Sequence, residues 1–239
     1  MKSFLFGFSS IFLAVTAFAE APFEVPASCL DALYDNGICV QAEPSTDEKG
    51  SVDAEAFILL YKTDFPDLQA AAYQYFDFEK WGAYYQAAEY DKTTVIASQP
   101  MNPLETVDDD GNPVTYLRDY FIMDTKIPII GKQRVRGVSY YQDRSPDPSR
   151  HLSWSFWLAR GEAIEVPEGE PVLTNSEGLA KQTGIMDIVE CDEFDLCAED
   201  EILIRYKARM RHEIAILPKY ASAFSRDQFE ALFTGMFLR

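Results

Sequence analysis

The chain has little histidine and lacks the common sequence motifs of catalytic and metal sites. It contains only two histidines, His151 and His212, among 239 residues. No G-x-S-x-G nucleophile elbow, Walker loop, H-E-x-x-H or G-x-G-x-x-G motif occurs after the first 19 residues. The motifs therefore give no support to the common hydrolase, nucleotide-binding and zinc-protease functions.

Basic residues are scarce as well. The chain has 21 Lys and Arg against 39 Asp and Glu, which gives a formal net charge of -18. A phosphate backbone or an anionic membrane surface would be repelled by such a charge. We therefore expect no nucleic-acid partner, and we attribute the charge mainly to solubility.

Long hydrophobic runs are missing after the N-terminus. There, Lys2 precedes the uncharged apolar stretch Phe4 to Phe18, and Ala17-Phe18-Ala19 has the small-x-small pattern of a cleavage site. The stretch is shorter than the ~20 residues that a bilayer span needs. We therefore expect residues 1–19 to be a cleaved secretory signal peptide, and the mature chain to be exported to the periplasm or the medium without stable membrane insertion.

Cysteine is limited to four residues, at positions 29, 39, 191 and 197. In an exported chain thiols oxidise, and of the three possible pairings the short spacings favour Cys29 with Cys39 and Cys191 with Cys197. A zinc site is the alternative, but C-x2-C spacing is absent and both histidines lie far from either pair in the sequence. We expect two disulfides, with no metal and no cofactor.

Composition divides the rest of the chain into an N-terminal segment and one body. Residues 20–53 contain the first cysteine pair and then the polar stretch Glu43 to Asp53, which is rich in Ser, Thr, Asp, Glu and Gly. This segment is predicted to be an arm and linker. Residues 54–239 are long enough for a single domain with its own core, which we expect to be a monomer.

The body is predicted to begin with a strand and two short helices. The apolar run Ala56 to Tyr61 is typical of a strand, and Asp67 is placed to cap a helix. Apolar residues recur at i, i+3, i+4, i+7 and i+8 on one face of that helix: Leu68, Ala71, Ala72, Tyr75 and Phe76. The second helix is predicted to start at Asp77, with three aromatic residues on one side: Phe78, Trp81 and Tyr85.

After Tyr90 the pattern changes to period two, which is typical of strands. Six segments are predicted to be strands: Thr93 to Ser98, Val114 to Asp124, Arg134 to Asp143, His151 to Arg160, Thr183 to Glu190 and Ile202 to Ile214. In the last of them an apolar set alternates with a mostly basic set, which predicts an antiparallel sheet covered on one side only. Asp108 to Asn112 resemble part of a calcium loop, but no Glu closes it, so a hairpin turn is predicted.

The C-terminus is predicted to be an amphipathic helix. Ser225 and Gln228 have the spacing of a capping box. Five large apolar residues then share one face: Phe229, Leu232, Phe233, Met236 and Phe237. This face must be buried, and the apolar side of the sheet is the available partner.

This order of elements is similar to that of the START-like, or helix-grip (SRPBCC), superfamily, which includes START lipid-transfer domains and bacterial polyketide cyclase-like proteins. Three parts of residues 54–239 carry the resemblance: Asp77-Phe78-Glu79-Lys80-Trp81, Lys126-Ile127-Pro128 through Arg134, and the alternating strand Ile204 to His212 that leads through Leu217-Pro218 into the terminal helix. An Arg-Asp pair often seen in the middle part is replaced by Gln133-Arg134-Val135-Arg136.

The resemblance implies an α+β helix-grip fold, in which a curved antiparallel sheet wraps around a long C-terminal helix and two short helices follow the first strand. It also implies an apolar tunnel that holds a lipid or another hydrophobic small molecule, and we expect the protein to bind or transport this molecule without catalysis. The expected lining combines aromatic and apolar residues of the second helix, the strands and the terminal helix: Trp81, Tyr85, Tyr120, Trp154, Phe156, Tyr206, Met210, Phe229 and Phe233.

Two other functions stay open at this point. One is an enzyme of the polyketide cyclase or aromatase type, for which His212 is a candidate general base, with Asp119 and Asp187 as candidate polar groups of the lining. The other is a protein-interaction module whose aromatic residues form a closed core.

Overall fold

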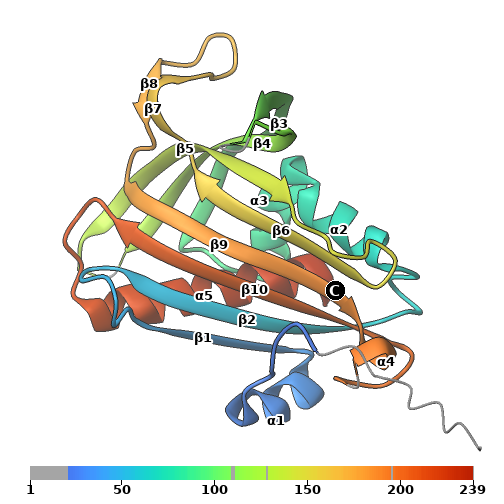
Figure 1. Ribbon diagram of the computed structural model, residues 1–239. Helices are drawn as coiled ribbons and strands as arrows, with labels where there is room; N and C mark the ends of the chain where they lie inside the picture. Colours follow the sequence, from blue (N-terminus) through green and yellow to red (C-terminus); the bar gives the residue numbers. More distant parts are fainter. Residues whose placement is uncertain (1–20, 109–110, 128, 195, 239) are drawn as a thin grey trace, which may run out of the picture.

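The computed structural model describes residues 21–108, 111–127, 129–194 and 196–238. One antiparallel sheet dominates it, with the strand order β1-β2-β10-β9-β6-β5-β4-β3. Figure 1 shows this sheet curving around the long helix α5, with α2 and α3 on the same side as α5. The expected signal peptide, residues 1–19, lies outside the described residues. Within the described residues no helix is long and apolar enough to cross a membrane.

The elements follow the predicted order of a strand, two short helices, a run of strands and a final helix. The strands of the large sheet are β1 (Ile38–Pro44), β2 (Val52–Tyr61), β3 (Thr93–Val107), β4 (Pro113–Ile127), β5 (Gly131–Asp143), β6 (His151–Leu158), β9 (Leu179–Glu190) and β10 (Glu201–His212). A separate hairpin consists of β7 (Arg160–Ile164) and β8 (Leu173–Asn175). The helices are α1 (Ala27–Asn36), α2 (Leu68–Phe76), the 3-10 turn η1 (Phe78–Lys80), α3 (Trp81–Ala87), α4 (Cys191–Phe194) and α5 (Pro218–Phe237). The predicted helix-grip architecture is confirmed.

The sheet begins earlier than the sequence suggested. Residues 38–44, within the segment predicted to be an arm and linker, form the edge strand β1, which pairs along its whole length with β2. Gly37 links α1 to β1 with a positive φ of 73°, a conformation that glycine adopts without steric cost. Helix α1 and strand β1 therefore belong to the folded body.

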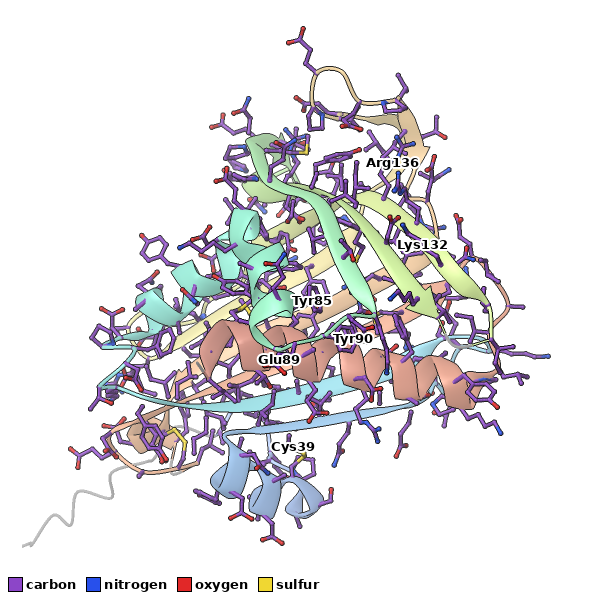
Figure 2. All side chains as sticks on the ribbon, turned by 180° about the vertical axis from the view of Figure 1, so that it is seen from behind. Cys39, Tyr85, Glu89, Tyr90, Lys132 and Arg136 are labelled. Carbon is purple, nitrogen blue, oxygen red and sulfur yellow. A yellow bond between two sulfur atoms is a disulfide. The ribbon has the colours of Figure 1, made fainter. Side chains whose placement is uncertain are left out.

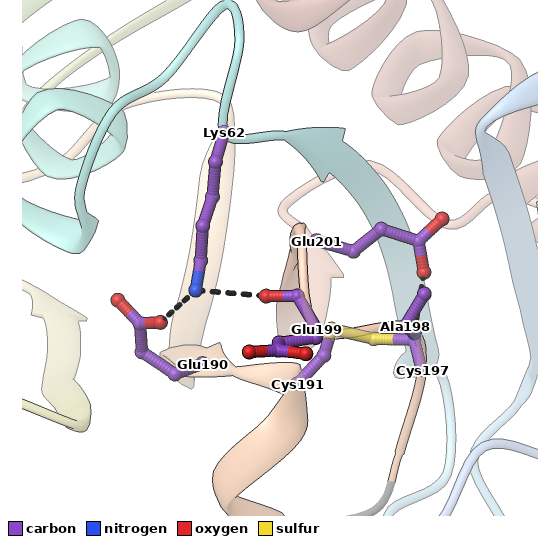
Figure 3. The surroundings of a disulfide bond; sticks show 7 residues. All are labelled: Lys62, Glu190, Cys191, Cys197, Ala198, Glu199 and Glu201. Atoms are coloured by element: carbon purple, nitrogen blue, oxygen red, sulfur yellow. Dashed lines mark hydrogen bonds and ion pairs between the residues drawn. A yellow bond between two sulfur atoms is a disulfide. The ribbon is translucent and has the colours of Figure 1, made fainter.

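Both predicted cysteine pairings are confirmed. The Cys29–Cys39 disulfide joins α1 to β1, and the Cys191–Cys197 disulfide closes the loop between β9 and β10. Figure 3 shows the surroundings of the second bond, where the Lys62 ammonium pairs with the Glu190 carboxylate and donates to the Glu199 carbonyl at 3.0 Å. These contacts tie the loop to the end of β2.

The prediction that the sheet is covered on one side only is wrong near its β1 edge. Phe57, Leu59 and Leu203 point to the face opposite α5, and they are buried with the two disulfides beneath α1 and the 191–197 loop. Further along this outer face the basic set of β10 pairs with acids of β2. Arg205 Nε lies 2.6 Å from Glu55 Oε1, for example.

The start of the terminal helix also differs from the prediction. Helix α5 begins at Pro218, seven residues before the predicted cap, and Ser225 is fully buried inside it. Proline is favoured in the first turn of a helix because its fixed φ suits the helix. It lacks an N–H, but an N–H at this position would have no partner within the helix. The cap predicted for α2 is confirmed, since Asp67 Oδ1 accepts a hydrogen bond from the Ala70 N–H at 2.8 Å.

Candidate ligand-binding cavity

A partly enclosed cavity lies between the inner face of the sheet and helices α3 and α5. It has about 70 Å³ of space for water-sized molecules. Inner-face side chains of β4, β5 and β10 line it from one side, and residues of α2, α3 and α5 line it from the other. Figure 2 shows the helical side of the molecule, with Tyr85 of α3 lying close to α5. Most of the lining is apolar or aromatic, which is typical of sites for hydrophobic molecules.

Stacked and tilted aromatic rings form the wall between β10 and α5. The Tyr206 ring stacks on Phe156 with 5.0 Å between centroids, and it contacts Phe229 at 5.1 Å and Phe233 at 5.2 Å. Aromatic pairs at such distances stabilise a fold by more than the burial of their apolar surface alone. The wall is therefore held in place by ring contacts between the last strand and the last helix.

The structure brings six of the nine predicted lining residues to this cavity: Trp81, Tyr85, Tyr206, Met210, Phe229 and Phe233. Trp154 and Phe156 are buried in the same inner core without bordering the cavity. Phe156 lies behind Tyr206, and Trp154 packs against Phe76 at 5.1 Å. That any of these residues binds a ligand stays a prediction.

Tyr120 lies on the other face of the sheet. It is fully buried in a separate cluster with Ile122 and Val138, and its hydroxyl donates to Glu170 Oε2 at 3.2 Å. Its neighbour Phe121 borders the cavity instead. Because side chains alternate between the faces of a strand, a shift of one residue moves a predicted side chain to the opposite face.

Asp119, one of the two aspartates considered for the lining on sequence grounds, is buried on the inner face of the sheet but is not among the residues that border the cavity. It shares a face of β4 with Phe121, Met123 and Thr125, which border the cavity. Burial raises the pKa of its carboxyl to about 7, although hydrogen bonds from Tyr141 and Ser139 act in the opposite direction. Its Oδ1 atom has no hydrogen-bond partner among the described residues. This oxygen therefore keeps a free acceptor position directly behind the lining residues Ser139 and Tyr141.

Three tyrosine hydroxyls lie near Asp119. Burial raises the pKa of Tyr75, Tyr141 and Tyr206, so these phenols stay neutral at physiological pH. The Tyr206 hydroxyl also accepts a hydrogen bond from Gln182 Nε2 at 3.2 Å. Tyr75, Ser139, Tyr141 and Tyr206 all border the cavity. With Asp119 they form what we call the Asp119 cluster.

The two histidines have different surroundings. His212 borders the cavity, where burial lowers its pKa, and its Nδ1 atom has no partner among the described residues. His151 lies on the outer face, and its Nε2 atom is 2.9 Å from Asp187 Oδ1. Asp187, a candidate for the lining on sequence grounds, is therefore not part of it.

No lysine or arginine borders the cavity in the part of the chain that the structure describes. The basic side chains of β10 point to the outer face, where Arg205 and Arg209 pair with acids of β2. Among the described residues, therefore, no lysine or arginine of the lining balances an ionised carboxylate in the Asp119 cluster.

No protein-family model and no curated protein matches this sequence. Solved structures resemble it in fold. A STAR-related lipid transfer protein from Xanthomonas axonopodis (fragment 25–204) has a TM-score of 0.55 and 12% identity, over 85% of this chain and 93% of that chain. Human STARD10 has a TM-score of 0.47 and 11% identity, over 84% of this chain and 69% of its own. A START superfamily protein from Mycobacterium smegmatis has a TM-score of 0.44 and 10% identity, over 77% of this chain and 92% of its own. This chain has the START-like fold.

Proposed function

We propose that this protein binds a hydrophobic small molecule, such as a lipid, in the cavity between the sheet and α5, and that it carries the molecule without reacting with it. The observation behind this proposal is the apolar cavity beneath α5. The lipid-transfer name of the similarly folded Xanthomonas axonopodis protein supports it. An aromatic lining with a few polar groups is what such ligands require.

The size of the cavity adds a condition to this proposal. A buried water needs roughly 10–15 Å³ by the same kind of measure, so the cavity accommodates only a few waters as it stands. Sites for drug-sized ligands are usually about 300–1,000 Å³. A long-chain molecule therefore enters only if side chains such as Phe229 and Phe233 rotate or α5 moves outward.

A cavity-filling substitution tests this function. Val135 borders the cavity and is buried, whereas Val172 is 82% exposed in the hairpin between β7 and β8. Val135→Phe should weaken the uptake of the apolar dye Nile red by roughly tenfold or more, because the added ring takes up ligand space. Val172→Phe, with the same change of residue, should bind the dye as the wild type does.

Circular dichroism and thermal melting show whether each variant is folded. Native mass spectrometry of the wild-type protein purified from its own host should find a copurifying hydrophobic molecule. A wild type that is folded, has a clean apo mass and takes up no Nile red would overturn the proposal and favour a closed core.

A catalytic role of the cyclase type has one observation in its favour. The Asp119 carboxyl has a pKa raised to about 7 and lies beside the Tyr141 hydroxyl, a pairing suited to acid–base chemistry at neutral pH. Incubation with a linear poly-β-ketone, followed by mass spectrometry, tests it. Loss of one water per cyclised molecule that depends on Asp119 would favour the enzyme over the carrier.

We propose further that the protein is exported, with residues 1–19 removed and the remainder forming one folded body. The N-terminal pattern and the two disulfides support this. N-terminal sequencing of the protein from its host should begin at Glu20. An intact Met1 with free thiols would contradict it.

A further inference from the structure

This inference rests on the proposed function and concerns which hydrophobic molecules the cavity accepts. Four residues that border it interact with the buried Asp119 carboxyl: Tyr141 and Ser139 through hydrogen bonds, and Tyr75 and Tyr206 electrostatically. A buried carboxyl with an unpaired oxygen is costly to a fold, because the lost contacts with water are not replaced. Asp119 Oδ1 is such an oxygen among the described residues.

The hydroxyls of Tyr141 and Ser139 hydrogen-bond the Asp119 carboxyl, but its Oδ1 atom is left without a partner among the described residues. Across the sheet Asp119 is paired with Pro100 of β3 and with Ser139 of β5. The titratable groups that interact with it are the neutral phenols of Tyr141, Tyr75 and Tyr206, from β5, α2 and β10. His212 is a further titratable residue of the lining, and no lysine or arginine borders the cavity in the described ranges.

We propose that Asp119 accepts a hydrogen bond from the polar end of the bound molecule, so that the cavity selects hydrophobic molecules that end in a donor, an amine or an alcohol, over fatty-acid carboxylates. A bound carboxylate would place a second negative charge near Asp119 with no cation between them, which is unfavourable at low dielectric. An ammonium group would instead neutralise the carboxylate. A hydroxyl group would donate to it without changing the net charge.

The protonation of Asp119 makes this selection dependent on pH. Burial raises the pKa of its carboxyl to about 7, so the neutral form dominates at pH 6 and the ionised form at pH 8. An alkyl amine stays protonated over this range, because a primary ammonium titrates near ~10. Its affinity should therefore rise from pH 6 to pH 8, that of a carboxylate should fall, and that of an alcohol should change little.

The experiment compares octylamine, 1-octanol and octanoate, which share one alkyl chain and differ in their polar ends. Displacement of Nile red from the full-length mature protein at pH 6 and pH 8 gives their relative affinities. In the wild type octylamine should bind roughly tenfold or more tightly than octanoate at pH 8, and less so at pH 6. Asp119→Asn, which keeps the shape and removes the charge, should reduce the difference to about twofold at both pH values.

Asp187→Asn is the matched control. Asp187 is also a buried aspartate of the sheet, but it lies on the outer face beside His151. This variant should retain the preference and the pH dependence of the wild type. If it loses both, the effect does not come from the cavity and the inference is wrong.

The remaining outcomes separate this inference from the proposed function. Equal affinities for the three molecules in the wild type would overturn the inference and leave ligand binding intact. No displacement by any of them, with no uptake of Nile red, would overturn the proposed function itself. If Asp119→Asn does not fold, the inference can be tested in the wild type by NMR, from the pH dependence of the chemical shift of the Asp119 carboxyl carbon. Octylamine should lower the pKa that this shift reports, and an unchanged pKa would contradict the inference.

Discussion

Replacing Asp119 by asparagine should change how the stability of the protein depends on pH. Burial raises the pKa of this carboxyl from 3.8 to about 7 in the folded protein. Below pH ~4 the group is protonated in both the folded and the unfolded chain, and its favourable contribution to stability is fully present. Between pH ~4 and ~7 the folded protein holds a proton that the unfolded chain has lost, so each pH unit removes about 1.4 kcal/mol. The total over this window is on the order of 4 kcal/mol.

Urea unfolding at pH 4.5, 6 and 8 measures this effect. The free energy of unfolding of Asp119→Asn minus that of the wild type should increase with pH, and the variant should be the more stable protein by several kcal/mol at pH 8. Other titrating groups cancel in this difference because both proteins contain them. Asp187→Asn should be less stable than the wild type, since it removes the carboxylate partner of His151 Nε2. A difference between Asp119→Asn and the wild type that does not vary with pH would refute the reasoning.

Two further predictions concern the frame around the cavity. Gly235→Ala should destabilise the protein by about 1–3 kcal/mol despite the better helix propensity of alanine, because its Cβ would overlap the backbone carbonyl of Tyr84. Gly82→Ala in α3 should be neutral or stabilising, because the nearest atom to its added Cβ is a side-chain carbon at 3.5 Å. Equal effects of the two substitutions in thermal melts would argue against the close approach of α5 to α3. Replacing Cys29 and Cys39 together by alanine should cost roughly 3 kcal/mol in chemical denaturation, since their bond closes a loop of ten residues, and an unchanged midpoint would show that this bond does not stabilise the fold.

The helix-grip fold was predictable because its two defining elements have strong periodic patterns. In β10 the apolar set that includes Ile204, Tyr206 and Met210 alternates with charged residues, and the structure places the set towards α5. The apolar face of α5 was predictable for the same reason. The sequence offered no comparable signal for β1, a short strand within a polar segment, because its place at the sheet edge depends on pairing with β2.

The predicted helix start at Ser225 shows how a local signal misleads. A serine followed three residues later by a glutamine has the spacing of a capping box wherever it occurs. In this protein the preceding turns already form helix from Pro218, so Ser225 is an interior residue and its hydroxyl has no partner among the described residues. The capping-box spacing alone does not distinguish the start of a helix from its interior when helix-forming residues precede the serine.

Strand β4 is where sequence reasoning was least able to find the site. Both faces of this strand are buried, so apolar residues do not alternate with polar ones and the sequence pattern does not show which face borders the cavity. Tyr120 points towards β7 and β8, and Phe121 points towards α5. The adjacent charges Arg118 and Asp119 point to opposite faces as well. Arg118 pairs with Glu165 at 2.8 Å, whereas the Oδ1 atom of Asp119 has no partner within the described chain. A sequence optimised only for folding would not place a carboxyl with an unpaired oxygen in an aromatic core, and such local conflicts are expected where function requires them. Asp119, which the sequence offered only as one of two candidate polar groups of the lining, is therefore the residue on which the proposed ligand selection depends.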